Sequence, residues 1–227
     1  MGIKQEIFTL MGGRIKMRRG LYNPTSDAVW LAAFAPRGVK TVLDAGVGSG
    51  GVSLCLWANN PDVRISGLDV SDQMLDACRD NAELNGMDIE LISADICTWR
   101  TNRTFDLVIT NPPYFNGTPA RHNAHHNADL SLWVSRCIAR VRPMGTFCII
   151  TDAATLGLVV AEMAKKLGDI TIIPLFGSRS MAERVLISGR LGSRGVSVIH
   201  RGYDMNFQPV LRDGLTIADT LSKLSQK

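Results

Sequence analysis

The sequence predicts an α/β fold with a mostly parallel central sheet. Between residues 41 and 189, apolar strand-like segments alternate with helix-like segments, an order typical of parallel sheets whose strands are joined by helices. A glycine-rich loop follows the first of these strands, and the next two strands end in Asp69 and Asp95. Because parallel strands end at one edge of their sheet, we expect these polar groups to line one ligand site.

A hairpin and a helix are expected ahead of this core. Residues 6–18 alternate between apolar and polar side chains around Gly12-Gly13, as in a short hairpin. Ser26 is a suitable N-cap for a helix over residues 27–35, and Pro36 would end that helix.

Turn and capping residues set the bounds of the core elements. Ser71 and Gly86 are suitable caps for the helix between them, and Pro143-Met144-Gly145 should turn the chain into a strand. Asp129 should begin a helix after a polar loop over residues 115–128. The expected strands cover residues 41–45, 63–69, 88–94, 104–110, 146–151, 170–175 and 184–189, and the expected helices lie near 50–59, 71–84, 129–141 and 153–167.

These elements divide the chain into three segments. We expect residues 1–40 to form an N-terminal extension that packs on a catalytic domain over residues 41–201. Residues 202–227 are expected to form a tail with an irregular stretch and a weak C-terminal helix. The length of 227 residues and the hydrophobic content of 45% suffice for one sizeable core.

The glycine-rich loop lies within residues 42–51. Small residues let the main chain approach a ligand closely, and the helix that follows presents free N–H groups. Gly46, Gly48 and Gly51 match the G-x-G-x-x-G pattern of dinucleotide-binding proteins. The pattern D-x-G-x-G-x-G of methyltransferases that use S-adenosylmethionine is matched as well, by Asp44, Gly46, Gly48 and Gly50. Two cofactor classes stay open at this loop.

Two acidic residues downstream bear on that choice. Asp69, beside Val70, could accept hydrogen bonds from both ribose hydroxyls of either cofactor. Asp95, beside Ile96, could receive the adenine amino group of S-adenosylmethionine. These four residues, together with Asn111 after the next strand, are therefore candidate cofactor contacts.

The tetrad Asn111-Pro112-Pro113-Tyr114 directly follows the strand expected over residues 104–110. The Asn111 side-chain carbonyl and the Pro112 main-chain carbonyl can both accept hydrogen bonds from one NH2 group. The prolines stiffen the loop and add no competing N–H, and Tyr114 can stack on the ring that carries the amine. The tetrad therefore predicts a catalytic grip on a planar nitrogen nucleophile.

With these motifs the chain resembles class I, Rossmann-like methyltransferases that act on amines. Over most of its length it is similar to bacterial tRNA adenine-N(6) methyltransferases that act beside the anticodon of a valine tRNA, above all in residues 10–14, 27–33, 111–115 and 182–187. Val47 departs from the Cys common in such loops. The resemblance implies S-adenosylmethionine as cofactor and direct methyl transfer to the exocyclic amine of adenine. It also implies a seven-stranded sheet in the order 3-2-1-4-5-7-6 whose last-formed strand is antiparallel.

Basic residues flank an acidic body. Residues 1–40 contain seven basic and two acidic side chains, and residues 176–201 contain five basic and one acidic side chain. The segment between them contains ten basic and fifteen acidic side chains, so it is negatively charged. Such segregation favours contacts with phosphate, and we expect tRNA as the partner. The expected tRNA contacts are Arg14, Lys16, Arg18, Arg19, Arg179, Arg184, Arg190 and Arg194.

Composition and motifs exclude several other classes. No apolar run is long enough for a membrane span, and residues 1–6 do not resemble a signal peptide. Five scattered cysteines without a C-x-x-C pair predict reduced thiols in a cytoplasmic protein. His122, His125 and His126 have no acidic or Cys partner nearby, so we expect a polar lid there and no metal site. The oligomeric state stays open between a monomer and a weak dimer.

Several side chains have two possible roles. Asp27 suits the first turn of its helix, where it would complement the helix dipole, or it could approach the cofactor. Asp106 is expected to serve the strand rather than the tetrad. Trp57, Trp99 and Trp133 are expected to pack in the core.

Three other functions stay open. Enzymes that methylate a glutamine amide in release factors use the same tetrad, but they carry a helical N-terminal domain that residues 1–40 cannot supply. A nicotinamide oxidoreductase would use Gly46, Gly48 and Gly51 and would leave the tetrad unexplained. A non-catalytic RNA-binding module would need only the basic flanks.

Overall fold

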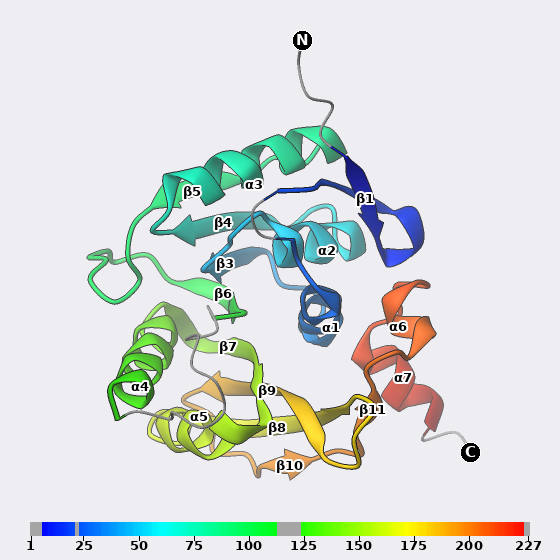
Figure 1. The fold of residues 1–227 in the computed structure, drawn as a ribbon. Coiled ribbons are helices and arrows are strands. Elements are labelled where there is room, and N and C mark those ends of the chain that lie inside the picture. The colour runs from blue at the N-terminus through cyan, green and yellow to red at the C-terminus, as the bar shows by residue number, and fades with distance from the viewer. Residues whose placement is uncertain (1–5, 21–22, 113–123, 225–227) are drawn as a thin grey trace.

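The computed structural model describes residues 6–20, 23–112 and 124–224, and one large β-sheet forms its centre (Figure 1). The seven expected strands are present in the described chain in the order β5-β4-β3-β6-β7-β9-β8. This is the predicted order 3-2-1-4-5-7-6, and β9 is antiparallel to both of its neighbours. These strands are β3 (Thr41–Ala45), β4 (Arg64–Asp69), β5 (Glu90–Ser93), β6 (Phe105–Thr110), β7 (Val141–Asp152), β8 (Leu167–Phe176) and β9 (Ala182–Leu191).

Two further strands correct the expected count of seven. β10 (Val198–Ile199) and β11 (Tyr203–Asp204) both pair with β8 in parallel and extend the sheet to nine strands. A two-residue strand is too short to show an alternating pattern, so the sequence could not reveal either of them.

The predicted hairpin is confirmed. β1 (Ile7–Leu10) and β2 (Ile15–Arg18) pair antiparallel around a short turn over Met11–Gly13. The main chain of β2 is fastened to α3 (Asp72–Asn85), because Lys16 N donates to Asn85 Oδ1 at 2.9 Å and Arg18 N donates to Asn81 Oδ1 at 2.8 Å.

Helices cover both faces of the sheet. Figure 1 shows α4 and α5 on one side and α1, α6 and α7 on the other. Buried residues of α1 and α2 share one hydrophobic cluster with β3 and β6, whereas those of α4 and α5 pack in a second cluster across the sheet. The remaining helices are α1 (Ser26–Phe34), α2 (Gly51–Asn59), α4 (Ala124–Ile138), α5 (Leu156–Met163), α6 (Gln208–Leu211) and α7 (Ile217–Leu224).

Several predicted helix boundaries were wrong. The N-cap of α1 is Thr25 rather than Ser26, and its side chain accepts a hydrogen bond from Asp27 N at 3.3 Å. α4 begins at Ala124 and not at Asp129, because the polar stretch ahead of the apolar periodicity continues the helix. The helix expected over residues 153–167 ends at Met163.

The expected turn at residues 143–145 lies inside β7. β7 begins at Val141, and its register against β6 shifts before Thr146, so the segment forms an irregularity within the strand. Met144 there has a φ of 61°. Proline and glycine marked the bend correctly, but a bend can interrupt a strand pair without ending it.

The C-terminal segment packs on α1. Trp30 is fully buried, and its Nε1 donates to the Met205 carbonyl at 3.0 Å. Its ring centroid lies 5.7 Å from that of Tyr203. Val210 and Ile217 are buried in the same cluster as Trp30. The boundaries at residues 40 and 201 stay predictions, although all three segments contribute to this cluster.

Candidate functional site

Four predicted site residues meet where the parallel strands end. β3 carries Asp44 next to its end, β4 ends in Asp69, and Asp95 and Asn111 closely follow β5 and β6. The register pairs Asp44 of β3 with Ile109 of β6, two positions before Asn111. The topology therefore gathers these groups at one edge of the sheet, as predicted.

The glycine loop between β3 and α2 is anchored to β4. The N–H groups of Gly46 and Val47 donate to the Leu68 carbonyl at 2.7 and 3.0 Å. Gly48 N donates to Asp69 Oδ2 at 2.9 Å. The loop thus rests on the same carboxylate that the sequence assigned to the ribose.

Glycine is required in this loop by the backbone. Gly46 and Gly50 have φ values of 77° and 90°, a region that residues with a Cβ rarely adopt. A Cβ on Gly50 would also lie 2.9 Å from Sγ of Cys78. Both the backbone conformation and the close neighbour therefore require glycine at position 50.

Asp44 is buried below the loop. Its Oδ2 accepts a hydrogen bond from Ser53 Oγ at 2.6 Å, whereas its Oδ1 is buried and has no hydrogen-bond partner in the part of the chain that the structure describes. The pKa of Asp44 is raised to about 7, mainly by burial and also by the neighbouring Asp69, although the hydrogen bond from Ser53 acts to lower it.

The raised pKa of Asp44 predicts a pH-dependent stability. The folded protein binds the Asp44 proton up to about pH 7, whereas the unfolded chain releases it near pH 4. Stability should therefore fall by about 2–3 kcal/mol between pH 5 and pH 8, and Asp44→Asn should remove that loss. Urea unfolding of both proteins at the two pH values measures the difference, and equal pH dependence would contradict the assignment.

The other cofactor candidates differ in exposure. Asp69 Oδ1 accepts from Ser71 N at 3.0 Å, and Val70 between them is 74% exposed. Asp95 is exposed and accepts from Cys97 N, whereas Ile96 is buried. A bound ligand could thus reach Asp69, Val70 and Asp95 directly, and Ile96 through its main chain.

Asn111 presents the second buried and unpartnered polar atom of the site. Its Oδ1 is buried and has no hydrogen-bond partner among the described residues, and Pro112 beside it is buried. Pro113 and Tyr114 lie outside the described residues. A buried carbonyl oxygen without a donor is costly, so this atom is suited to a donor that arrives with a ligand.

Trp133 of α4 is a neighbour of the site that the sequence did not reveal. Its Nε1 donates to Thr110 Oγ1 at 3.1 Å, and Thr110 Oγ1 donates to the Ala45 carbonyl at 2.7 Å. A Cβ on Gly46 would lie 3.2 Å from the Trp133 ring. Trp133 therefore packs between the glycine loop and the residue before Asn111. A lone tryptophan on a helix gives no local sign of such a position.

Asp27 and Asp106 have structural partners. Asp106 Oδ2 accepts from Lys40 N and Thr41 N at 2.8 and 3.0 Å, as expected for a residue that serves the sheet. Asp27 is buried and pairs with Arg184 Nε at 3.1 Å.

The described residues contain neither a metal-ligand cluster nor a membrane-spanning helix. His122 lies outside the described residues. Within them, no group of three or more His, Cys, Asp or Glu is placed to hold a metal ion. No described helix has the length and apolarity needed to cross a bilayer.

Two surface hollows among the described residues lie away from this edge. The larger, of about 560 Å³, is at the opposite end of the strands, where Thr41, Arg64 and Phe105 begin β3, β4 and β6. The smaller, of about 420 Å³, lies beside residues 35–39 and 214–219. Neither hollow is lined by residues of the glycine loop. The candidate site is therefore defined by the polar groups at the carboxyl ends of β3 to β6.

The predicted tRNA contacts form two groups at opposite ends of the sheet. The hairpin packs on α3 near β4 and β5, whereas β9 and the residues after it lie near the β8 edge. Figure 1 shows the two regions apart, with the glycine loop and α1 between them. Lys16, Arg179, Arg190 and Arg194 are exposed, and Arg18 is half-buried.

Other members of these groups bind within the protein. Arg14 donates to the Ala58 carbonyl at 2.5 Å, and Arg19 pairs with Glu6 at 2.9 Å. Arg184 is shared between two carboxylates, which does not agree with the open phosphate contact that the sequence predicted.

Comparisons with known proteins agree with this geometry. The family model described as the methyltransferase small domain matches residues 25–173, well over half of the chain. A tRNA1(Val) (adenine(37)-N6)-methyltransferase of Klebsiella pneumoniae subsp. pneumoniae is 30% identical over 156 residues, which cover 63% of each chain. A release factor glutamine methyltransferase of Streptococcus pneumoniae is 37% identical over 76 residues, which cover 34% of this chain and 27% of that one. The chain thus spans less than two thirds of the length of these relatives.

A solved structure supports the architecture. A Listeria monocytogenes protein, provisionally described as a class I S-adenosylmethionine-dependent methyltransferase, superposes with a TM-score of 0.60 at 18% identity, covering 88% of this chain and 67% of that one. At this identity the likeness shows the fold alone. It confirms the predicted Rossmann-like fold.

Proposed function

Because the chain belongs to the methyltransferase small domain family, we propose that it transfers a methyl group from S-adenosylmethionine to the exocyclic amine of an adenine in RNA, in tRNA near the anticodon. The observation that carries this proposal is the Oδ1 atom of Asn111, which is buried just after β6 and has no hydrogen-bond partner among the described residues. It is the acceptor that an incoming NH2 group needs.

The edge of the sheet fits S-adenosylmethionine. The half-buried main chain of Gly46 and Gly48 would lie against the donor, and Gly50 would supply the left-handed turn that ends the loop. Asp44 Oδ1 is a buried acceptor that receives no hydrogen bond from any described residue, which suits the ammonium group of the methionine part. Asp69 has lone pairs left for the ribose hydroxyls.

The adenine ring of the donor is expected on the far side of Asp69. Val70 offers it an exposed apolar side chain. Asp95 would accept a hydrogen bond from the adenine amino group, and the main chain of Ile96 would border the ring.

The protein mainly positions the acceptor. When bound, S-adenosylmethionine supplies a sulfonium that makes its methyl carbon a strong electrophile. The amine of adenine is a weak nucleophile because its lone pair is delocalised into the ring. Asn111 Oδ1 and the Pro112 carbonyl would accept its two hydrogens, free the lone pair and hold the nitrogen about 3 Å from the methyl carbon. Tyr114 would stack on the flipped base, which can return about 1–3 kcal/mol of the cost of unstacking it.

Two kinds of methyl acceptor carry an NH2 group that Asn111 and Pro112 could hold, adenine and a glutamine amide. Enzymes that methylate each of them are among the relatives. Alignment length does not separate them, since a glutamine-methylating relative of Deinococcus radiodurans is matched over 160 residues and the adenine-methylating one over 156. The exposed basic residues Lys16, Arg179, Arg190 and Arg194 lie on both sides of the site and favour a phosphate-bearing substrate. A glutamine amide is the second candidate, because its NH2 group presents the same chemistry. A cytoplasmic location stays a prediction.

A transfer assay distinguishes the two acceptors. Purified protein is incubated with methyl-labelled S-adenosylmethionine and either total tRNA from a strain that lacks the gene or a purified release factor. We expect label in the tRNA, recovered as N6-methyladenosine by mass spectrometry of the nucleosides. Label only in a glutamine of the release factor would replace the RNA proposal with the second candidate.

Asp69→Ala should weaken binding of the donor. The substitution removes the expected ribose contact and also the acceptor of the Gly48 N–H. The Kd for S-adenosylhomocysteine, measured by calorimetry, should rise about 10- to 100-fold, since each charged hydrogen bond contributes about 1.5–3 kcal/mol. Asp62→Ala, in an exposed turn before β4, is the control. An unchanged Kd for Asp69→Ala would show that the ribose lies elsewhere.

A further inference from the structure

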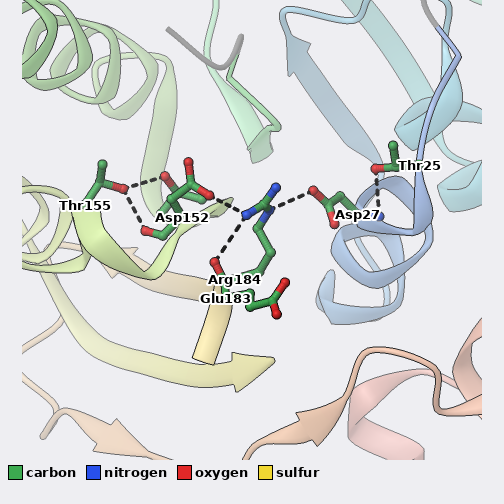
Figure 2. Close-up of polar contacts among 7 residues, drawn as sticks. Thr25, Asp27, Asp152, Thr155, Glu183 and Arg184 are labelled. Atoms are coloured by element: carbon green, nitrogen blue, oxygen red, sulfur yellow. Dashed lines mark hydrogen bonds and ion pairs between the residues drawn. The ribbon is translucent and has the colours of Figure 1, made fainter. Parts of the chain in front are cut away.

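Arg184 joins two elements that border opposite sides of the site. It lies on β9 directly across from Asp152, the last residue of β7. Its guanidinium pairs with Asp152 and, through Nε at 3.1 Å, with Asp27 Oδ2 in the first turn of α1. Figure 2 shows Arg184 between the two carboxylates.

The two ion pairs have different surroundings. The side chain of Asp27 is 5% exposed, so its charge depends on a partner inside the protein. The side chain of Asp152 is 45% exposed and water can solvate it. The need to neutralise Asp27 therefore explains its own ion pair with Arg184 but not the ion pair between Arg184 and Asp152. The second pair orients the guanidinium and ties α1 to the end of β7.

Asp152 lies on the acceptor side of the site. Cys148 and Ile150 of β7 face the same core cluster as Leu107 and Ile109 of β6. Side chains alternate between the two faces of a strand, so Asp152, two residues after Ile150, and Asn111, two residues after Ile109, continue on this same face. The register pairs Thr110 with Ile149. Asp152 therefore ends β7 on the same face, and at the same edge of the sheet, where Asn111 follows β6.

The start of α1 lies on the donor side. A Cβ on Gly51, the first residue of α2, would lie 2.5 Å from Cβ of Pro24, so Pro24 packs directly behind the glycine loop. Asp27 follows Pro24 by three residues. A shift of α1 would thus be passed to the glycine loop.

We propose that Arg184 is a positioning residue for methyl transfer, because its bridge from Asp27 to Asp152 sets the spacing between the donor loop and the acceptor-binding edge. The proposal rests on the proposed function for the identity of the reaction. A planar guanidinium can serve two carboxylates at once, whereas a lysine ammonium is a single point charge that bridges them poorly. The role differs from that of a phosphate contact, which would act on RNA affinity alone.

The test compares Arg184→Met with Arg103→Met. Arg103 also pairs with a carboxylate, Glu90, at 2.6 Å, but at the opposite end of the strands. For Arg184→Met we expect kcat to fall about 10²-fold, as misplacement by about 1 Å can do, with the KM for tRNA and its salt dependence nearly unchanged. Arg184→Lys should recover folding stability while its kcat stays at least about tenfold low. Arg103→Met should keep the wild-type kcat.

Several outcomes overturn the proposal. A higher, salt-sensitive KM with normal kcat in Arg184→Met would make Arg184 a phosphate contact. A lower melting temperature with normal kcat would leave it a merely structural role. If Arg184→Met does not fold, Asp152→Asn decides, since its exposed carboxylate allows replacement: kcat should fall about tenfold, and a wild-type value refutes the bridge.

Binding of S-adenosylhomocysteine separates this proposal from the proposed function. If the wild-type protein methylates no tRNA, the function fails but titration still tests the bridge. Arg184→Met should bind S-adenosylhomocysteine at least about fivefold more weakly than Arg103→Met does. Equal affinities would overturn the proposal.

Discussion

Asn111→Ala is expected to lower kcat for methyl transfer by about 10²- to 10³-fold, the usual cost of removing one aligned hydrogen-bonding group that acts in the transition state. Within the described residues the Oδ1 of Asn111 is buried and has no hydrogen-bond partner, so its removal leaves none of their donors unsatisfied. The Kd for S-adenosylhomocysteine should therefore change by less than about threefold. Single-turnover assays and calorimetry measure the two effects separately.

Two variants control for this result. Asn102→Ala removes an exposed asparagine in the loop before β6 and should leave kcat unchanged. Asn111→Asp keeps an oxygen acceptor and should retain more activity than Asn111→Ala. Activity of Asn111→Ala within about tenfold of the wild type would refute the amine clamp.

Trp30→Ala is expected to destabilise the folded protein by about 3–5 kcal/mol, the range for truncating a fully buried tryptophan. Trp30 is 0% exposed, donates to the Met205 carbonyl and packs against Tyr203. The truncation leaves a cavity under α1 and removes the hydrogen bond from Trp30 to the C-terminal segment. Urea unfolding gives the loss directly.

Trp57→Ala is the matched control for stability. Trp57 is only half-buried at the end of α2, so its truncation should cost less than about 2 kcal/mol. Equal losses in Trp57→Ala and Trp30→Ala would show that α1 does not depend on the C-terminal segment.

Local patterns were sufficient for the elements that carry the site. The strands have apolar runs long enough to be recognised, Ser71 and Gly86 do cap α3, and the glycine spacing placed the loop. The strand order came from the resemblance, since no local signal specifies which strands pair. The positive φ values at Gly46 and Gly50 then explain why that spacing is informative.

What the sequence could not predict depends on contacts between distant residues. Arg184 and Asp27 are 157 positions apart, so composition alone placed Arg184 among the basic residues that contact RNA. Trp133 reaches the glycine loop only because α4 packs beside β6. β10 and β11 exist because β8 offers an open edge, and their own residues are too few for a pattern.

The most direct measurement is a crystal structure with S-adenosylhomocysteine and an adenosine-containing stem–loop. We predict that N6 of the adenine lies about 3 Å from Asn111 Oδ1, with the sulfur on the opposite side of the nitrogen and close to the glycine loop. An Asn111 carbonyl that is hydrogen-bonded within the protein and turned away from the sulfur would contradict the amine clamp and the function derived from it.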